Sequence, residues 1–176
     1  MHFLLGPLSE AHGGAALNSP VVVIGIGNEY RRDDGVGPAV VAAINELALP
    51  GVRLVTGIED PMDLLDAWSA AALAVLVDAA VISPSTPGRI HRCAASDVAA
   101  ARGMSSHSLN VAEVFALGQA LDRVPDQLVV FTVEAADTGH GVGLTPQVAA
   151  AVPDVVAAAM AEIVSRSAEP HLGPGR

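Results

Sequence analysis

Basic residues are scarce in this chain, and none of them is lysine. Against 19 aspartates and glutamates stand 9 basic residues, all arginine, which gives 176 residues a formal net charge of −10. Nucleic acids and anionic membranes are bound through clustered positive charge, so the composition predicts neither as a partner. A lysine-free chain also cannot form a Walker A loop, in which a lysine binds the β- and γ-phosphates.

Cysteine is almost absent too. The single Cys93 excludes an intramolecular disulfide and is typical of a reducing compartment. The first 20 residues lack the basic and long apolar regions of a secretion signal. The apolar stretch 70–82 is interrupted by Asp78, and no stretch is expected to reach the ~20 residues of a membrane-spanning helix. These features predict a soluble, cytoplasmic protein.

Aromatic residues make up only 3% of the chain, whereas apolar residues make up 51%, so the core must consist of aliphatic side chains. Apolar periodicity predicts strands alternating with helices. The expected strands are 21–26, 52–58, 73–77, 89–93 and 128–133, and the expected helices are 36–49, 61–71, 96–101, 108–121 and 146–165. This order predicts the α/β class: a single three-layer domain over 21–167, with a largely parallel twisted sheet of about five strands and helices on both faces. Residues 1–20 and 168–176 are expected to be disordered tails.

Some details of these elements can also be predicted. Asp60 should cap the helix that starts at Pro61, and Thr145 should cap the helix that starts at Pro146. Pro153 should break or kink this last helix. In the helix 108–121, the spacing predicts an inward face made by Leu109, Val111, Val114, Leu117 and Leu121.

A glycine-rich loop follows the first strand. Residues 25–28 read Gly-Ile-Gly-Asn, and Gly25 and Gly27 allow the backbone to turn sharply beneath a bound group. Asp33 and Asp34 then precede the helix that opens near Gly35. A phosphate would favour donors at this position, whereas two carboxylates favour a cation.

Three polar residues are expected at the carboxyl edge of the sheet, where parallel sheets bind ligands. Asp34 follows the first strand, and Asp78 ends the apolar run 73–77. His107 stands just before the helix expected at Ser108. If the loop that carries His107 lies beside the two aspartates, the group suits a divalent transition metal.

Other interpretations of these residues remain open. Asp34 taken alone is typical of a helix N-cap. His91 and Cys93 share one face of a strand, but they lack a third ligand and are interpreted as structural. Tyr30 stands where a dinucleotide fingerprint needs its third glycine, yet an acidic residue after the second strand keeps a nucleotide site possible. The alternative to an enzyme is therefore a non-catalytic metal-sensing or nucleotide-binding module on a flavodoxin-like scaffold.

The motifs follow one another in a recognisable order. They are Gly25-x-Gly27-Asn28, Asp33-Asp34-Gly35-x-Gly37, Asp78-Ala79, Ser106-His107 and Gly141-x-Gly143-Leu144-Thr145-Pro146. In this order, over roughly 21–164, the chain resembles the maturation endopeptidases of [NiFe] hydrogenases. The sequence contains neither a Gly-x-Ser-x-Gly elbow nor a His-Glu-x-x-His pair, so serine hydrolases and zincins are not expected.

The resemblance implies an endopeptidase that removes a short C-terminal extension from the nickel-loaded precursor of a hydrogenase large subunit. Asp34, Asp78 and His107 match the positions proposed as nickel contacts in the family, although many members carry glutamate in place of Asp34. The nickel would arrive with the substrate, and no tightly bound organic cofactor is expected. Water polarised by the nickel would attack the peptide bond, with a carboxylate as general base.

The same resemblance assigns two loops to the substrate. Gly25, Gly27 and Asn28 would position the peptide, and the flexible loop 139–144 would shape the cleft. A nickel-free precursor would lack the metal contact, so metal insertion would be checked before cleavage.

Overall fold

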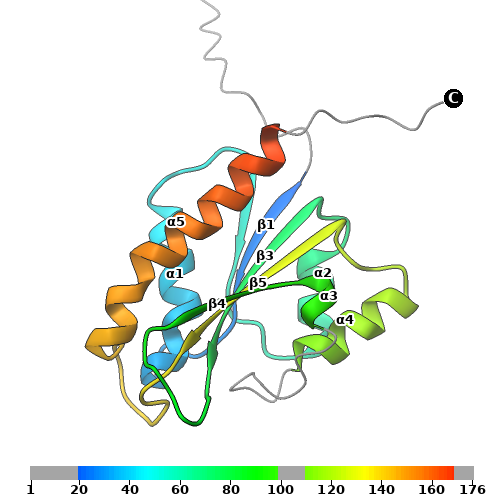
Figure 1. Cartoon of the computed structure of the whole chain (residues 1–176). Coiled ribbons are helices and arrows are strands. Elements are labelled where there is room, and N and C mark those ends of the chain that lie inside the picture. The colour runs from blue at the N-terminus through cyan, green and yellow to red at the C-terminus, as the bar shows by residue number, and fades with distance from the viewer. Residues whose placement is uncertain (1–19, 99–109, 169–176) are drawn as a thin grey trace, which may run out of the picture.

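The computed structural model describes residues 20–98 and 110–168 of the chain. A five-stranded sheet in the order β2-β1-β3-β5-β4 forms its centre (Figure 1). The strands are β1 (Val21–Gly25), β2 (Val52–Val55), β3 (Leu73–Ala80), β4 (Ile90–Ala94) and β5 (Gln127–Glu134). All neighbouring strands pair in parallel except β4, which pairs antiparallel with β5. The prediction of an α/β fold with a largely parallel sheet is confirmed.

Helices cover both faces of the sheet (Figure 1). They are η1 (Arg32–Gly35), α1 (Val36–Asn45), α2 (Pro61–Trp68), α3 (Ala95–Val98), α4 (Val111–Ala120) and α5 (Pro146–Ala168). One core cluster joins α1 and α5 to the face formed by Val75, Val77 and Phe131. A second cluster joins α2 and α4 to the opposite face, formed by Leu76 and Val130 among others. Successive residues of a strand point to opposite faces of the sheet, so apolar strands give both faces an apolar surface. The sheet is therefore the middle of three layers, with helices on either side.

The backbone of α1 lies directly against the ends of β1 and β3. A Cβ built on Gly25 would lie 2.5 Å from the carbonyl carbon and oxygen of Gly37. A Cβ on Gly37 would lie 2.7 Å from the carbonyl oxygen of Val77 and closer still to that of Ile26. Only glycine fits at both positions, because backbone atoms cannot move aside as a flexible side chain can. This contact fixes the start of α1 over the carboxyl edge of the sheet.

Local signals placed most element boundaries well. Asp60 caps α2 in a reciprocal capping box with Asp63, and Pro61 is the first helical residue, as predicted. β3 continues two residues past Asp78 to Ala80, so Asp78 lies within the strand rather than at its last position. The predicted tails fall outside the described residues apart from Pro20 and Ala168. Pro20 accepts a hydrogen bond from Ala72 N (2.8 Å).

The predicted face of α4 is partly wrong. The helix begins at Val111 behind an Asn110 N-cap, three residues later than the Ser108 start that periodicity predicts. Val111 and Val114 are buried as expected, but Leu117 and Leu121 are 41% and 49% exposed. Phe115 and Gly118 are buried instead, and the ring of Phe115 packs edge-on against Trp68. Leu109 lies outside the described residues.

Helix α5 differs from expectation in two ways. It continues through Pro153 as one helix of 23 residues, so the break that was one of the two predicted outcomes does not occur. Among the described residues, α5 is also the one helix that is long enough and apolar enough to cross a membrane. The sequence predicted no segment of that kind. Val148, Val155 and Ala159 on α5 are fully buried against α1 and the sheet. This burial explains its apolar composition, since one face of the helix belongs to the core.

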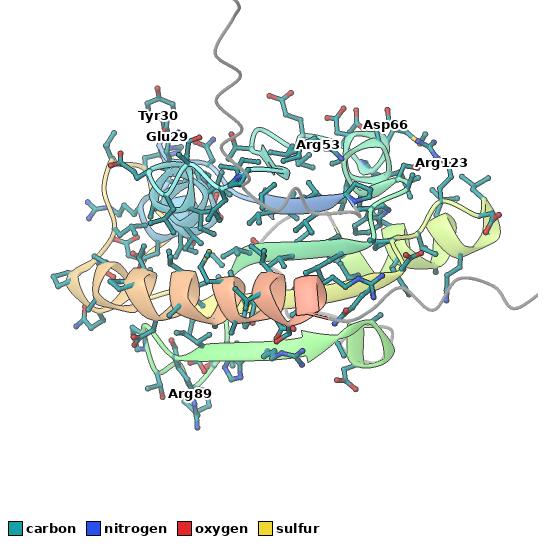
Figure 2. The ribbon with its side chains drawn as sticks, turned by 90° about the horizontal axis from the view of Figure 1, so that it is seen from above. Glu29, Tyr30, Arg53, Asp66, Arg89 and Arg123 are labelled. Carbon is teal, nitrogen blue, oxygen red and sulfur yellow. The ribbon has the colours of Figure 1, made fainter. Side chains whose placement is uncertain are left out.

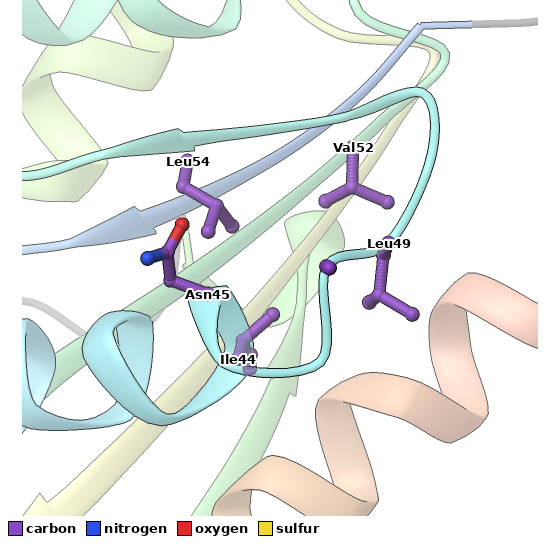
Figure 3. A pocket seen from close by; sticks show the side chains of 6 residues that line it. Ile44, Asn45, Leu49, Val52 and Leu54 are labelled. Atoms are coloured by element: carbon purple, nitrogen blue, oxygen red, sulfur yellow. The ribbon is translucent and has the colours of Figure 1, made fainter.

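A shallow pocket of about 310 Å³ lies at the amino end of β2 (Figure 3). It is lined by Ile44, Asn45, Ala48, Leu49, Val52 and Leu54. These residues belong to the end of α1 and to the edge strand β2, so the pocket lies at the opposite end of the sheet from the predicted site.

The contact between Gly25 and Gly37 makes a testable prediction. Gly25→Ala should lower the free energy of unfolding by about 3 kcal/mol, because the new methyl group overlaps backbone that cannot move aside. Gly57→Ala is the matched control, since its Cβ meets open space and only a positive φ opposes it, at about 1 kcal/mol. Urea unfolding of the two variants measures the difference. Equal losses would show that the strand–helix contact tolerates a side chain.

Candidate functional site

Asp33 joins two loops at the carboxyl edge. Its buried carboxylate accepts hydrogen bonds from the backbone N–H groups of Ala136 (2.9 Å), Asp137 (2.9 Å) and Thr145 (2.6 Å). It also accepts one from the Thr145 hydroxyl (2.9 Å). The sequence suggested that Asp33 and Asp34 both face the site. The structure corrects this for Asp33, whose oxygens are used to hold the loop after β5 against the loop after β1.

Backbone hydrogen bonds strengthen this connection. Arg32 N donates to Gly141 O (2.9 Å), and Gly141 N donates to Tyr30 O (2.9 Å). The side chain of Arg31 donates to Thr138 O (3.3 Å). The loop 139–144, expected to be flexible, is therefore hydrogen-bonded to residues 30–32 beside the site.

Asp34 holds the backbone of the glycine-rich loop through a hydrogen bond. It is 1% exposed, and its Oδ2 accepts from Asn28 N at 3.0 Å. The Asn28 side chain in turn accepts from Tyr30 N at 2.9 Å. No side-chain cap is present at the start of η1 or α1, so the interpretation of Asp34 as a simple helix cap is not what the structure shows.

Asp78 lies in β3 next to the start of the same loop. It is 1% exposed, and its Oδ1 accepts from the N–H of Ala79 at 2.8 Å. Ile26 N donates to Val77 O at 2.9 Å, so the loop after β1 begins beside Asp78. The short helix η1, which carries Asp34, contacts β3. Asp34 and Asp78 are 44 residues apart in the sequence. The fold thus brings their two buried carboxyl groups to one edge of the sheet.

His107, the third predicted metal contact, lies outside the described residues. Within 20–98 and 110–168, no group of three or more histidine, cysteine, aspartate or glutamate side chains is placed to hold a metal ion. Carboxylates with an imidazole are a donor set that suits a divalent transition metal.

A cleft of about 610 Å³ opens between the loops that follow β1 and β2. It is lined by Ile26, Gly27, Asn28, Glu29, Tyr30, Pro38, Thr56, Gly57, Ile58 and Glu59. Glu29 and Tyr30, which both line the cleft, lie next to each other (Figure 2). Gly27 and Asn28 line the cleft, whereas Gly25 packs against α1. Clefts of this size accommodate small ligands or short chain segments.

The structure adds an acidic residue that the sequence analysis missed. Glu134 is buried at the end of β5, and its Oε1 lies 2.7 Å from Nε2 of His91. Thr86 N donates to the other oxygen, and Gly88 N donates to the backbone oxygen of Glu134 (2.8 Å). The hydrogen bond from Thr86, followed by the one with His91, lowers the pKa of the Glu134 carboxyl. One signal was available: Glu134 continues the alternation of a strand expected to end at Val133.

Replacing Asp33 tests the loop connection. Asp33→Asn should lower the free energy of unfolding by about 3 kcal/mol, because an amide nitrogen must face backbone N–H donors that the carboxylate now satisfies. Asp154→Asn, an exposed position on α5, should change it by less than about 0.5 kcal/mol. Chemical denaturation measures both variants. An Asp33→Asn protein as stable as wild type would refute the connection.

The lowered pKa of Glu134 predicts a pH dependence. Its folded-state pKa lies below the ordinary value of 4.5, so the carboxylate stabilises the fold fully above pH 4.5 and ceases to do so as pH falls through the folded pKa. Glu134→Gln should therefore be less stable than wild type at neutral pH, and the difference should shrink in acid. Urea unfolding between pH 7 and pH 3 measures this. A difference that stays constant would contradict the shift.

Comparisons with known proteins place this chain in a family. The family model described as hydrogenase maturation protease (HycI) matches residues 38–162. No curated protein sequence matches the chain. Among solved structures, the hydrogenase maturating endopeptidase HybD from E. coli shares 23% identity at a TM-score of 0.74, covering 83% of this chain and 93% of that chain.

Two other solved structures have the same fold. An endopeptidase from Escherichia coli, solved in solution, is 24% identical at a TM-score of 0.75 and covers 83% of this chain and 93% of that chain. The [NiFe] hydrogenase maturation protease HybD from Thermococcus kodakarensis is 21% identical at a TM-score of 0.68, covering 81% and 98%. At these identities the structures show the fold, and the family model carries the assignment. With well over half of its length matched by that model, the chain belongs to the hydrogenase maturation protease family and is a peptidase.

Proposed function

We propose that this peptidase removes a short C-terminal extension from the nickel-loaded precursor of a [NiFe] hydrogenase large subunit. The observation that carries the proposal is the meeting of η1 and β3, which brings two buried carboxyl groups, Asp34 and Asp78, to the edge where the cleft opens. Carboxylate oxygens are ligands that divalent metal ions accept in proteins, and with an imidazole they form a donor set that suits a transition metal. His107 is proposed as the third contact.

The nickel is part of the substrate in this proposal. Asp34, Asp78 and His107 would contact a metal already held by the precursor, and this contact would align the tail for cleavage. Only interactions that differ between loaded and unloaded precursor can discriminate between them, and the metal contact is such an interaction. An unloaded precursor would bind weakly and out of position.

The cleft would hold the chain segment next to the scissile bond. Gly27 and Asn28 form part of its wall, and Asp34 fixes the backbone of Asn28 through a 3.0 Å hydrogen bond. The same carboxyl group that faces the metal would thereby also set the shape of the peptide site. The single cysteine supports placing the protein in a reducing cytoplasm, where the precursor would be met before assembly.

The experiment compares loaded and unloaded precursor by mass spectrometry of the intact products. The wild-type protein should release a short C-terminal peptide from the nickel-loaded precursor and leave the nickel-free form intact. Asp34→Asn, Asp78→Asn and His107→Ala should each lower the rate by about 100-fold or more, because each removes a contact that aligns the substrate. Asp154→Asn, exposed on α5, serves as the control with unchanged processing.

Two outcomes would refute the proposal. If neither precursor is cleaved, the protein lacks the proposed activity. If both precursors are cleaved equally, the nickel does not control cleavage. Thermal melting of each variant must match wild type, so that a lost fold is not mistaken for a lost contact.

A further inference from the structure

Three polar side chains form a row across the carboxyl edge of the sheet. Asp78 of β3 is in register with Thr132 of β5, and Thr132 is in register with His91 of β4. Register partners on neighbouring strands point to the same face of a sheet. One step inward, Leu76, Val130 and Cys93 belong to the cluster beneath α2 and α4, and the row of polar residues continues that face.

The row reaches the site because β4 runs antiparallel. The second residue of β4, His91, therefore lies at the edge where the parallel strands end. Arg89, just before β4, lies at the same end of the molecule as Glu29 and Tyr30 (Figure 2). Strand spacing puts the backbone of His91 about 10 Å from that of Asp78, with Thr132 of β5 between them, so a peptide group and a water molecule that meet both side chains would lie over Thr132.

A buried carboxylate orients the imidazole of His91. Its Nε2 lies 2.7 Å from Glu134 Oε1, and the side chains are 30% and 4% exposed respectively. Glu134 is itself held by Thr86 N, so the carboxylate cannot easily turn away. Among the described residues, none forms a hydrogen bond with Nδ1 of His91. A carboxylate on one ring nitrogen, with no described residue bonded to the other, is the arrangement that prepares a histidine for proton transfer.

Thr132 supports the same location. Its Oγ1 is buried and, among the described residues, has no hydrogen-bond partner. An unsatisfied buried hydroxyl costs about 1–3 kcal/mol and calls for an explanation such as a functional site. Thr132 stands between Asp78 and His91 in the row. Its hydroxyl is therefore placed to hydrogen-bond to a water molecule that lies between these two side chains.

We propose that His91 is the general base of the peptide hydrolysis and that Glu134 is its positioning residue. This inference rests on the proposed function and assigns the base to an imidazole, where the family resemblance suggested a carboxylate. As the water oxygen bonds to the scissile carbonyl carbon, the breaking O–H bond gives its proton to Nδ1 of His91. The C–N bond then breaks, its electron pair stays on nitrogen, and that nitrogen takes the proton from Nδ1.

The charged groups around His91 are compatible with this role. Glu134 faces the ring from β5, and Arg89, just before β4, acts on Glu134. Asp78 lies two strands away on β3. Arg92 points to the opposite face of β4, where it pairs with Glu162 of α5 at 2.7 Å. The ionised Glu134 holds the ring by its Nε2 side in either protonation state of the imidazole, and Nδ1 stays available for the water.

The deciding variant is His91→Gln. Its amide can still donate to Glu134, so a purely structural contact survives, whereas proton transfer is lost. The rate constant kcat for the nickel-loaded precursor should fall by about 100-fold or more, with KM and melting temperature close to wild type. The limb of the kcat–pH profile that depends on the imidazole base should also disappear. Arg92→Gln, next to it on the opposite face of β4, should process like wild type.

A second variant keeps the test decisive if His91→Gln fails to fold. His91→Ala should regain activity when imidazole is added, since a free base can occupy the space of the missing ring. Glu134→Gln should keep KM and displace the imidazole limb of the pH profile. A His91→Gln protein with kcat within twofold of wild type, or a folded His91→Ala protein that imidazole does not restore, would overturn the inference. Failure of wild type on the loaded precursor would instead overturn the proposed function, and the base with it.

Discussion

The close approach of α1 to the sheet is the constraint on which the site depends. Gly25 and Gly37 place backbone against backbone, and the carbonyl groups of Ile26 and Val77 occupy the space where a side chain on Gly37 would lie. This contact brings η1 onto β3, so that Asp34 and Asp78 reach the same edge. Asp33 then ties the loop after β5 to this base with four hydrogen bonds. The cleft is thus built on rigid supports.

Much of the fold could be predicted because its signals are local. The β-branched run of β1, the apolar run of β3 and the Asp60-Pro61 cap are each read within a few residues, and each was placed nearly correctly. The face of α4 was not, because Phe115 is held by Trp68, which belongs to another helix. Pro153 was expected to interrupt α5, yet the packing of Val148 and Val155 on either side keeps the helix continuous.

The site was predictable only in part. Asp33 and Asp34 are neighbours of identical chemistry, and nothing nearby in the sequence separates them. The separation comes from residues 136, 137 and 145, whose N–H groups select Asp33 from more than 100 positions away. Glu134 was missed for a similar reason, since its partner His91 is 43 residues distant and the pairing requires the direction of β4 to be known. His107 stays a prediction.

The reversed edge strand β4 has a consequence for how such an enzyme diversifies. β4 has a neighbouring strand on one side only, whereas β1, β3 and β5 have one on each side. Fewer of its residues must therefore fit against neighbouring strands. Its antiparallel direction nevertheless delivers its first residues to the reactive end of the sheet. Substitutions in β4 can therefore add or remove reactive side chains at this end of the sheet. The glycine contact between α1 and the sheet, which positions the aspartates, is left unchanged.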